Sequence, residues 1–113
     1  MDDAVYKYLS DVLDSIIEIE EETDIRGRRF EVYCSDRVYR KFIERNIAII
    51  GEAMNQILRL SPNIQISAGR KIVDTRNLVV HSYDSIDNEI IWAIIIRHLP
   101  LLKQEVTTLL DKE

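Results

Sequence analysis

Apolar residues recur every three or four positions along most of the chain, which is the spacing of helices with one buried face. The first helix is expected to begin at Asp2 and Asp3, whose negative charge suits a helix N-terminus. It ends in the acidic run EIEEETD at 18–24. Because acids suit a helix C-terminus poorly, we expect this end either to face a cation or a basic partner, or to fray. The predicted buried stripe consists of Val5, Tyr8, Leu9, Val12, Leu13, Ile16 and Ile17.

A second helix with a broader apolar surface is expected to run to about Leu60. The stretch IRGRRFEVYC before it alternates only weakly, so we interpret residues 24–35 as a loop with room for a short helix. Ser35 or Asp36 can cap the second helix. Ile49 and Leu60 widen its apolar face, which indicates contact with another helix or another subunit. The main stripe consists of Val38, Phe42, Ile43, Ile47, Ile50, Met54, Ile57 and Leu58.

Two or three further helices complete the pattern. SPN at 61–63 ends the second helix, and a third begins near Ala68 or Gly69. DSID at 84–87 is expected to form a turn and N-cap before a fourth helix, in which Pro100 either makes a kink or starts a fifth. No strand pattern competes, so the fold class is all-α, an antiparallel up-and-down bundle of four to five helices. The inward residues after the turn are Ile90, Ile91, Ile94, Ile95, Leu101, Leu102, Val106, Leu109 and Leu110.

Size and composition limit the class of protein. The chain has 113 residues, 46% of them hydrophobic, so a single folded domain over residues 1–113 is expected. Cys34 is the only cysteine, which rules out an internal disulfide and favours a reducing, cytoplasmic setting. The N-terminus lacks an apolar signal segment. The longest apolar run, Ile90–Ile96, is too short to cross a bilayer, so we predict a soluble protein without membrane contact.

The charge of the chain is unevenly placed. The net charge of −5 argues against a protein that coats nucleic acid without specificity. However, residues 1–25 carry nine acids and one base, whereas residues 26–76 carry eleven bases and five acids. The densest basic group is Arg26, Arg28 and Arg29. The middle of the chain therefore offers either a local basic surface that contacts RNA or a partner, through Arg28 and Arg29, or ordinary solvated helix faces.

The most reactive side chains lie in one run, DTRNLVVHSYD at 74–84. On a helix, Asn77 and His81 share one stripe, so the amide can reach the imidazole and orient it. Arg76 and His81 are five positions apart, which places them about 140° apart and about 7.5 Å apart along the axis. One straight helix cannot bring both to a single atom. Three arrangements stay open. The two side chains line two sides of a groove, or the helix ends near His81 so that its ring can turn, or a second copy of the chain completes the site.

These side chains indicate phosphate chemistry. Arg76 offers a permanent planar cation for phosphate oxygens, His81 can move a proton near neutral pH, and Tyr83 adds a hydroxyl. Cleavage of RNA without a metal needs a base for the 2′-OH, a charge stabiliser and an acid for the leaving oxygen. A two-fold dimer with two copies of His81 would supply both base and acid. The alternative is that these residues are purely structural. His81 then lies at the boundary of the core, Tyr83 is an aromatic at the core edge, and Arg76 pairs with Asp74.

Other kinds of site find no support in the sequence. There is no H-E-x-x-H, no cysteine cluster, no spaced set of carboxylates and no glycine-rich phosphate loop. We therefore expect no metal and no cofactor. His98, beside Pro100, is expected at the surface or at a helix end, and Trp92 in the core or an interface.

The motif Arg76-Asn77-Leu78-Val79-Val80-His81-Ser82-Tyr83 resembles the signature of HepT-like proteins in the HEPN superfamily. These proteins carry R-x4–6-H with a polar residue after the arginine, a preference that Asn77 fits. ERNIAIIGEAMNQIL at 44–58 is similar to their second long helix. DSIDNEIIWAIIIRHLPLL at 84–102 is similar to their turn, tryptophan-bearing helix and Leu-Pro break. The resemblance covers most of the chain from about residue 38.

The resemblance implies a metal-independent endoribonuclease that is the toxin of a toxin–antitoxin system. It implies a homodimer, or a higher assembly, with Arg76 and His81 as catalytic residues at a cleft between protomers. It also implies a nucleotidyltransferase-like antitoxin of the MntA type, which adds AMP to Tyr83. The added phosphate would compete with RNA for Arg76.

Two other classes of function stay open at this point. The chain is alternatively a non-catalytic nucleotide-binding partner of a minimal nucleotidyltransferase, or a purely structural bundle. His81 separates the first two hypotheses, because RNA cleavage needs its imidazole whereas nucleotide binding can rest on Arg76.

Overall fold

The computed structural model describes residues 2–67, 69–74 and 87–112, and every regular element in these ranges is helical. The elements in chain order are α1 (Asp3–Ile25), α2 (Phe30–Ser35), α3 (Arg37–Leu60), α5 (Asn88–Ala93), the π-helical turn η1 (Ile94–His98) and α6 (Leu99–Asp111). Residues 69–74 are also helical. The all-α class predicted from the periodicity is therefore confirmed.

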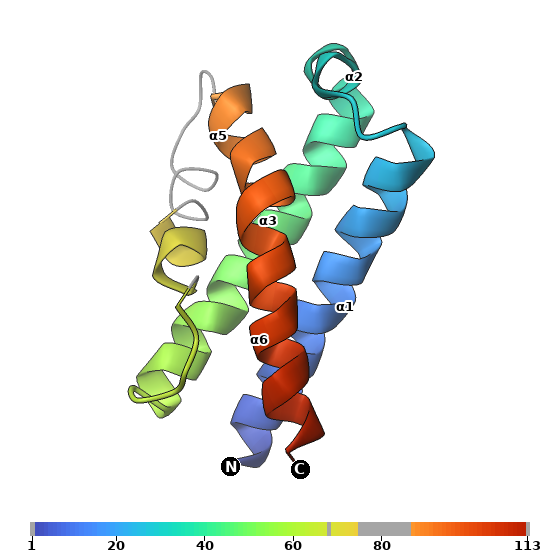
Figure 1. Ribbon diagram of the computed structural model, residues 1–113. Coiled ribbons are helices and arrows are strands. Elements are labelled where there is room, and N and C mark those ends of the chain that lie inside the picture. The colour runs from blue at the N-terminus through green and yellow to red at the C-terminus, as the bar shows by residue number, and fades with distance from the viewer. Residues whose placement is uncertain (1, 68, 75–86, 113) are drawn as a thin grey trace.

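Three long helices form the body of the molecule, which measures 42 × 28 × 19 Å. α1 packs against both α3 and α6 and runs antiparallel to them (Figure 1). The start of α1 and the end of α6 lie at one end of the molecule, and α2 and α5 lie at the other. Residues 69–74 lie beside α3, on the side away from α1. The segment that follows them, residues 75–86, contains the sequence motif and lies outside the described residues.

The core is built from the stripes that the periodicity predicts. Its fully buried side chains come from α1, α2, α3, residues 69–74, α5, η1 and α6. Three residues placed in the stripes prove to be exposed instead: Val38 at 75%, Leu101 at 44% and Ile90 at 36%. Each of them lies within the first three residues of its helix, where the core takes the following side chain instead: Tyr39, Ile91 and Leu102 are buried. The main contributors are Leu9, Val12, Ile16, Ile19, Ile43, Ile47, Ile50, Met54, Ile57, Ile72, Ile91, Ile94, Leu102 and Val106.

The acidic end of α1 faces cations from its own chain. Glu22 forms an ion pair with Arg26, and Asp24 accepts from Arg28 at 2.9 Å. Lys103 of α6 reaches Glu20 at 2.8 Å. Of the two outcomes expected for this end, contact with cations is the one observed.

The short helix α2 occupies the loop region, and the turn before it requires left-handed backbone. Gly27 has φ 77° and Arg28 has φ 54°, which reverses the chain after α1. Asp36 then caps α3, its Oδ1 accepting the Tyr39 N–H at 3.0 Å. Of the two caps predicted, Asp36 is the one used.

Pro100 starts a further helix, which is one of the two alternatives predicted for it. It lies in the first turn of α6, directly after η1, in which the Leu99 N–H bonds to the Ile94 carbonyl. Proline lacks an N–H and its ring crowds the carbonyl four residues before it, so a wider turn at this point relieves both problems. The π-turn η1 therefore connects α5 to α6 without a loop, and this turn carries Arg97 and His98.

Candidate functional site

The predicted site residues Arg76, Asn77, His81 and Tyr83 all lie in residues 75–86, outside the described part of the chain. Their roles therefore stay predictions. The structure does describe the two segments that lead into and out of this run, together with the side chains around them.

The segment that enters the motif is held against α3 and α6. The Ser67 N–H and hydroxyl both donate to Glu105 of α6, at 2.8 and 3.0 Å. Gly69 is buried against α3, where an added Cβ would meet the Met54 terminal methyl at 2.8 Å. Ile72 and Val73 then enter the core. These contacts fix the helical residues 69–74 that precede the motif, with Asp74 exposed at the last of them.

The segment that leaves the motif is fixed by a helix cap. The Asp87 carboxylate accepts the Glu89 N–H at 2.8 Å and starts α5. The N-cap predicted within DSID is thus confirmed at its last residue, and residues 84–86 lie outside the described chain. Both ends of the motif segment are therefore anchored to the same bundle.

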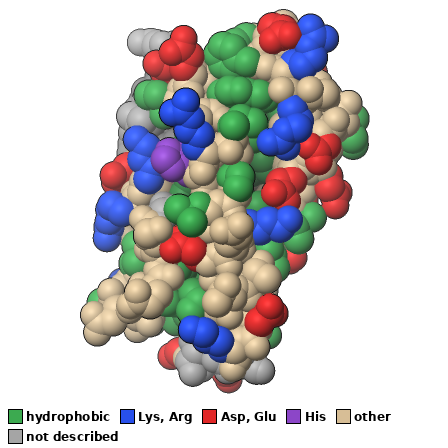
Figure 2. Space-filling view, viewed as in Figure 1, with side chains coloured by type: hydrophobic (Ala, Val, Ile, Leu, Met, Phe, Trp, Pro, Cys, Tyr) green, Lys and Arg blue, Asp and Glu red, His purple; other side chains and the backbone are tan. Residues whose placement is uncertain are grey.

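Basic side chains gather between these two segments. Lys71 precedes the motif, and Arg97 and His98 belong to η1; we call these three residues the basic cluster. Partial burial lowers the pKa of His98, and the positive charges of Lys71 and Arg97 lower that pKa further. Figure 2 shows this histidine bordered by lysine and arginine side chains. The imidazole is therefore neutral around pH 7, and Lys71 and Arg97 carry the charge.

The arginines singled out from the sequence lie elsewhere. Arg28 pairs with Asp24, and Arg29 donates to Glu31 at 2.7 Å, so each has an acid beside it. Arg26 is paired with Glu22 and Asp36 and lies 4.7 Å from the centre of the Tyr39 ring. Its role is structural, because it ties α1 to the start of α3. An RNA contact through Arg28 and Arg29 remains a prediction, and they would have to exchange these acids for phosphate.

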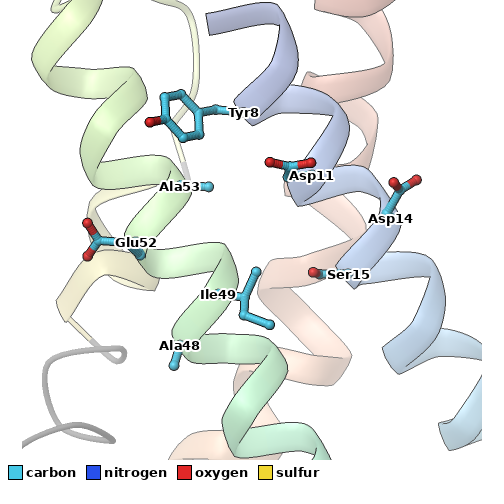
Figure 3. Close-up of a pocket in the computed structure, with 8 residues that line it drawn as sticks. All are labelled: Tyr8, Asp11, Asp14, Ser15, Ala48, Ile49, Glu52 and Ala53. Carbon is cyan, nitrogen blue, oxygen red and sulfur yellow. The ribbon is translucent and has the colours of Figure 1, made fainter. Parts of the chain in front are cut away.

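A groove between α1 and α3 has the opposite character. It has a volume of about 480 Å³, and side chains of α1 face those of α3 across it (Figure 3). Asp11 and Asp14 on α1 and Glu52 on α3 give it an acidic lining that disfavours nucleic-acid phosphate. The exposed Ile49, which the broad apolar stripe placed toward another helix or subunit, also lies in this groove.

The described residues contain neither a metal-binding group nor a membrane-spanning helix. No group of three or more His, Cys, Asp or Glu side chains is arranged to hold a metal ion. No described helix is both long and apolar enough to cross a bilayer.

Comparisons with known proteins identify the family. The family model described as "Ribonuclease HepT-like" matches residues 7–109, from the first turns of α1 to the last turn of α6. The chain belongs to the HepT-like ribonuclease family. The family resemblance predicted from the sequence is thus confirmed, and residues 76–83 lie within the matched range.

Relatives in the HepT-like family match over most of their length. A protein of Thermococcus cleftensis named "Probable ribonuclease HepT" is 32% identical over 100 residues, which cover 85% of this chain and 86% of the relative. Two proteins named "Putative RNase" are each 28% identical. The one from Methanocaldococcus jannaschii covers 90% of this chain and 93% of its own length; the one from Caldanaerobacter subterraneus covers 79% and 80%. No solved structure matches this chain at a significant level.

The HepT-like match gives the basic cluster its context. The sequence predicted His98 at the surface or at a helix end, and it lies at the end of η1, directly before α6. Lys71 and Arg97 were not singled out. The available signal was the pair Arg97-His98 directly before Pro100, where a proline in a continuous helix favours a local irregularity. The proximity of Lys71 had no signal in the sequence, because it brings together positions far apart in the chain.

Proposed function

We propose that the chain is a metal-independent endoribonuclease that acts as the toxin of a toxin–antitoxin system. The observation that carries this proposal is the family match over residues 7–109, which includes the motif R-N-x-x-x-H-x-Y. The basic cluster supports it, because Lys71 comes five positions before Arg76 and adds positive charge beside the segment that carries the motif.

In this mechanism the RNA supplies its own nucleophile. His81 takes the proton of a ribose 2′-OH, and the 2′ oxygen attacks the adjacent phosphorus. Arg76 stabilises the charge that builds on the phosphate oxygens, and Asn77 holds the imidazole in its working orientation. The bond from phosphorus to the 5′ oxygen breaks, and an acid protonates that oxygen. The products are a 2′,3′-cyclic phosphate and a free 5′-OH.

The acid is the His81 of a second protomer. One imidazole cannot take and give a proton in the same step, so a two-fold dimer with both copies at one cleft supplies the pair. The spacing of Arg76 and His81 supports this arrangement, because two residues five positions apart on a helix lie on different faces.

Tyr83 is the point of control. A nucleotidyltransferase-like antitoxin transfers AMP from ATP to its hydroxyl oxygen: the bond between the α and β phosphates breaks, pyrophosphate leaves and the hydroxyl proton is lost. The new phosphate places negative charge near Arg76. The modified toxin then cannot bind the RNA phosphate, whereas the unmodified protein cleaves RNA.

The test is cleavage of total RNA by the purified chain in EDTA, beside His81→Ala and Arg76→Ala proteins prepared identically. We expect His81→Ala to reduce the rate at least 100-fold, the lower end of what general acid–base catalysis contributes. Arg59→Ala is the matched control for Arg76→Ala. Arg59 is exposed near the end of α3 and pairs only locally with Gln56, so its loss should leave the rate unchanged.

The mass of the purified chain must be measured in the same preparation. Cleavage that persists equally in His81→Ala would contradict the proposal. An inert wild-type protein with an added AMP would be a silenced toxin, and its activity should appear in protein made without the antitoxin. An inert protein of unmodified mass would favour the nucleotide-binding partner.

A further inference from the structure

A second pocket lies at the end of the molecule where α2 meets α5 and η1. Its volume is about 520 Å³, within the range of small-molecule sites. It is lined by Phe30, Glu89, Trp92, Ala93, Ile96 and Arg97, and we call it the aromatic pocket. Glu89 of its lining comes two residues after the Asp87 cap, so this side of the pocket is close in the chain to the motif segment.

Two aromatic rings form one wall of this pocket. The ring centroids of Phe30 and Trp92 are 5.8 Å apart, and the two ring planes are tilted by 54°. The ring centroid of Trp92 also lies 5.9 Å from that of the buried Tyr33. Tyr33 is completely buried, whereas Phe30 and Trp92 are only partly buried. Packing of α2 on α5 therefore accounts for one side of these two rings and leaves part of each facing the pocket.

A cation stands at the edge of the aromatic wall. Arg97 is exposed and has no hydrogen bond or ion pair among the residues that the structure describes. It also belongs to the basic cluster, so positive charge continues from the pocket past His98 to Lys71 and the segment that enters the motif. Arg97 and His98 are adjacent in η1, and Arg97 lines the pocket while His98 lies within the electrostatic influence of Lys71.

We propose that the aromatic pocket binds one unpaired nucleotide of a single-stranded RNA, with its base on Phe30 and Trp92 and its phosphate on Arg97. Partly exposed aromatic rings beside a cation are the usual means of binding single-stranded nucleic acid, because every base has a face that stacks. The strand then continues over the basic cluster toward the motif.

Glu89 fixes which part of the nucleotide enters. Its carboxylate repels phosphate, but it can accept a hydrogen bond from the exocyclic amino group of a base. The base is therefore expected between the rings and Glu89, and the phosphate on the Arg97 side. The inference rests on the proposed function in that the strand is the substrate of the ribonuclease, but binding itself requires no cleavage.

Trp92 makes the binding directly observable, because it is the only tryptophan of the chain. The full-length protein is titrated with a 2′-O-methyl oligoadenylate hexamer, which cannot be cut because its 2′ oxygens are blocked. Stacking of a base on Trp92 should quench its fluorescence in a saturable way. Arg97→Ala and Phe30→Leu should each weaken binding by about tenfold, as expected for the loss of one phosphate contact or one stacking ring.

The matched control is again Arg59→Ala, at the opposite end of the bundle, which should bind like the wild type. Two further titrations define the ligand. Linear polyphosphate of similar charge should leave Trp92 fluorescence unchanged, and 5′-AMP alone should bind at least tenfold more weakly than the hexamer. Quenching by polyphosphate, AMP binding as tight as the hexamer, or an Arg97→Ala protein with unchanged affinity would each overturn the inference.

Failure here and failure of the proposed function are distinguishable. Cleavage of RNA through His81 without quenching of Trp92 would support the proposed ribonuclease activity and contradict nucleotide binding in the aromatic pocket. A protein that is quenched by the hexamer but cleaves nothing keeps the pocket and loses the proposed activity.

Discussion

Tyr33 and Tyr39 form an edge-to-face pair with ring centroids 5.4 Å apart, yet their hydroxyl groups differ in hydrogen bonding. The Tyr39 hydroxyl lies 2.7 Å from the Thr23 hydroxyl, which is completely buried. The Tyr33 hydroxyl is buried with no hydrogen-bond partner among the described residues, and burial raises the pKa of Tyr33 far above its ordinary value. A buried hydroxyl without a partner costs free energy, whereas one within a buried pair stabilises the fold.

Substitution of each tyrosine by phenylalanine should therefore act in opposite directions. Tyr39→Phe strands the Thr23 hydroxyl and should lower the free energy of unfolding by about 1–2 kcal/mol. Tyr33→Phe removes a stranded group and should raise it by about 1 kcal/mol. Urea unfolding of the two variants and the wild type measures both, and each variant serves as the control of the other. A loss of stability in Tyr33→Phe would show that its hydroxyl has a partner in solution.

At the scale of single elements, the helix boundaries followed from local chemistry. The cap at Asp36 was predictable because a short acceptor side chain before an apolar stripe satisfies free N–H groups. Its pKa is held below the ordinary carboxyl range by its hydrogen bond to the Tyr39 N–H and then by the charge of Arg26, 3.4 Å away. The π-turn before Pro100 was not predictable, because either a kink or a helix break would also have satisfied the proline.

Removal of this cap tests the start of α3. Asp36→Ala should lower the free energy of unfolding at pH 7, and Asp36→Asn should lower it less, because an amide oxygen still caps but carries no charge for Arg26. A depressed folded pKa means that the charged cap contributes above the ordinary carboxyl pKa of about 3.9 and loses this contribution as the pH falls below it. The gap between wild type and Asp36→Asn in urea unfolding should therefore shrink from pH 7 to pH 3. A gap of constant size would exclude the charge as its cause.

At the scale of the whole molecule, the sequence predicted a basic middle but not where positive charge would gather. Arg26, Arg28 and Arg29 are close to acids in the chain and pair with them. The basic cluster instead joins Lys71 to Arg97 and His98, across a bundle whose helix order no local pattern encodes. The aromatic pocket has the same origin, because Phe30 and Trp92 meet only when α2 packs on α5. The chemistry of the motif could be predicted from one run of residues, whereas the side chains around that run could be identified only from the fold.

The proposed dimer makes a prediction at this scale. Wild type and His81→Ala protein, mixed in equal amounts, unfolded and refolded together, should retain about one quarter of the cleavage rate of the same total amount of wild type. Random pairing leaves only that fraction of dimers with two intact histidines. Protomers that act alone would retain half. Mixing wild type with Arg59→Ala protein controls for losses on refolding and should retain the full rate.

The start of α1 and the end of α6 lie together, at the opposite end of the molecule from α2 and α5. A surface or a fluorophore attached at either of these ends would therefore be held away from the aromatic pocket and the basic cluster. Molecules tethered in this way would present the proposed RNA-binding end to the solution in one common orientation. Binding and release of single RNA strands could then be followed one molecule at a time, with the attachment point held clear of the strand.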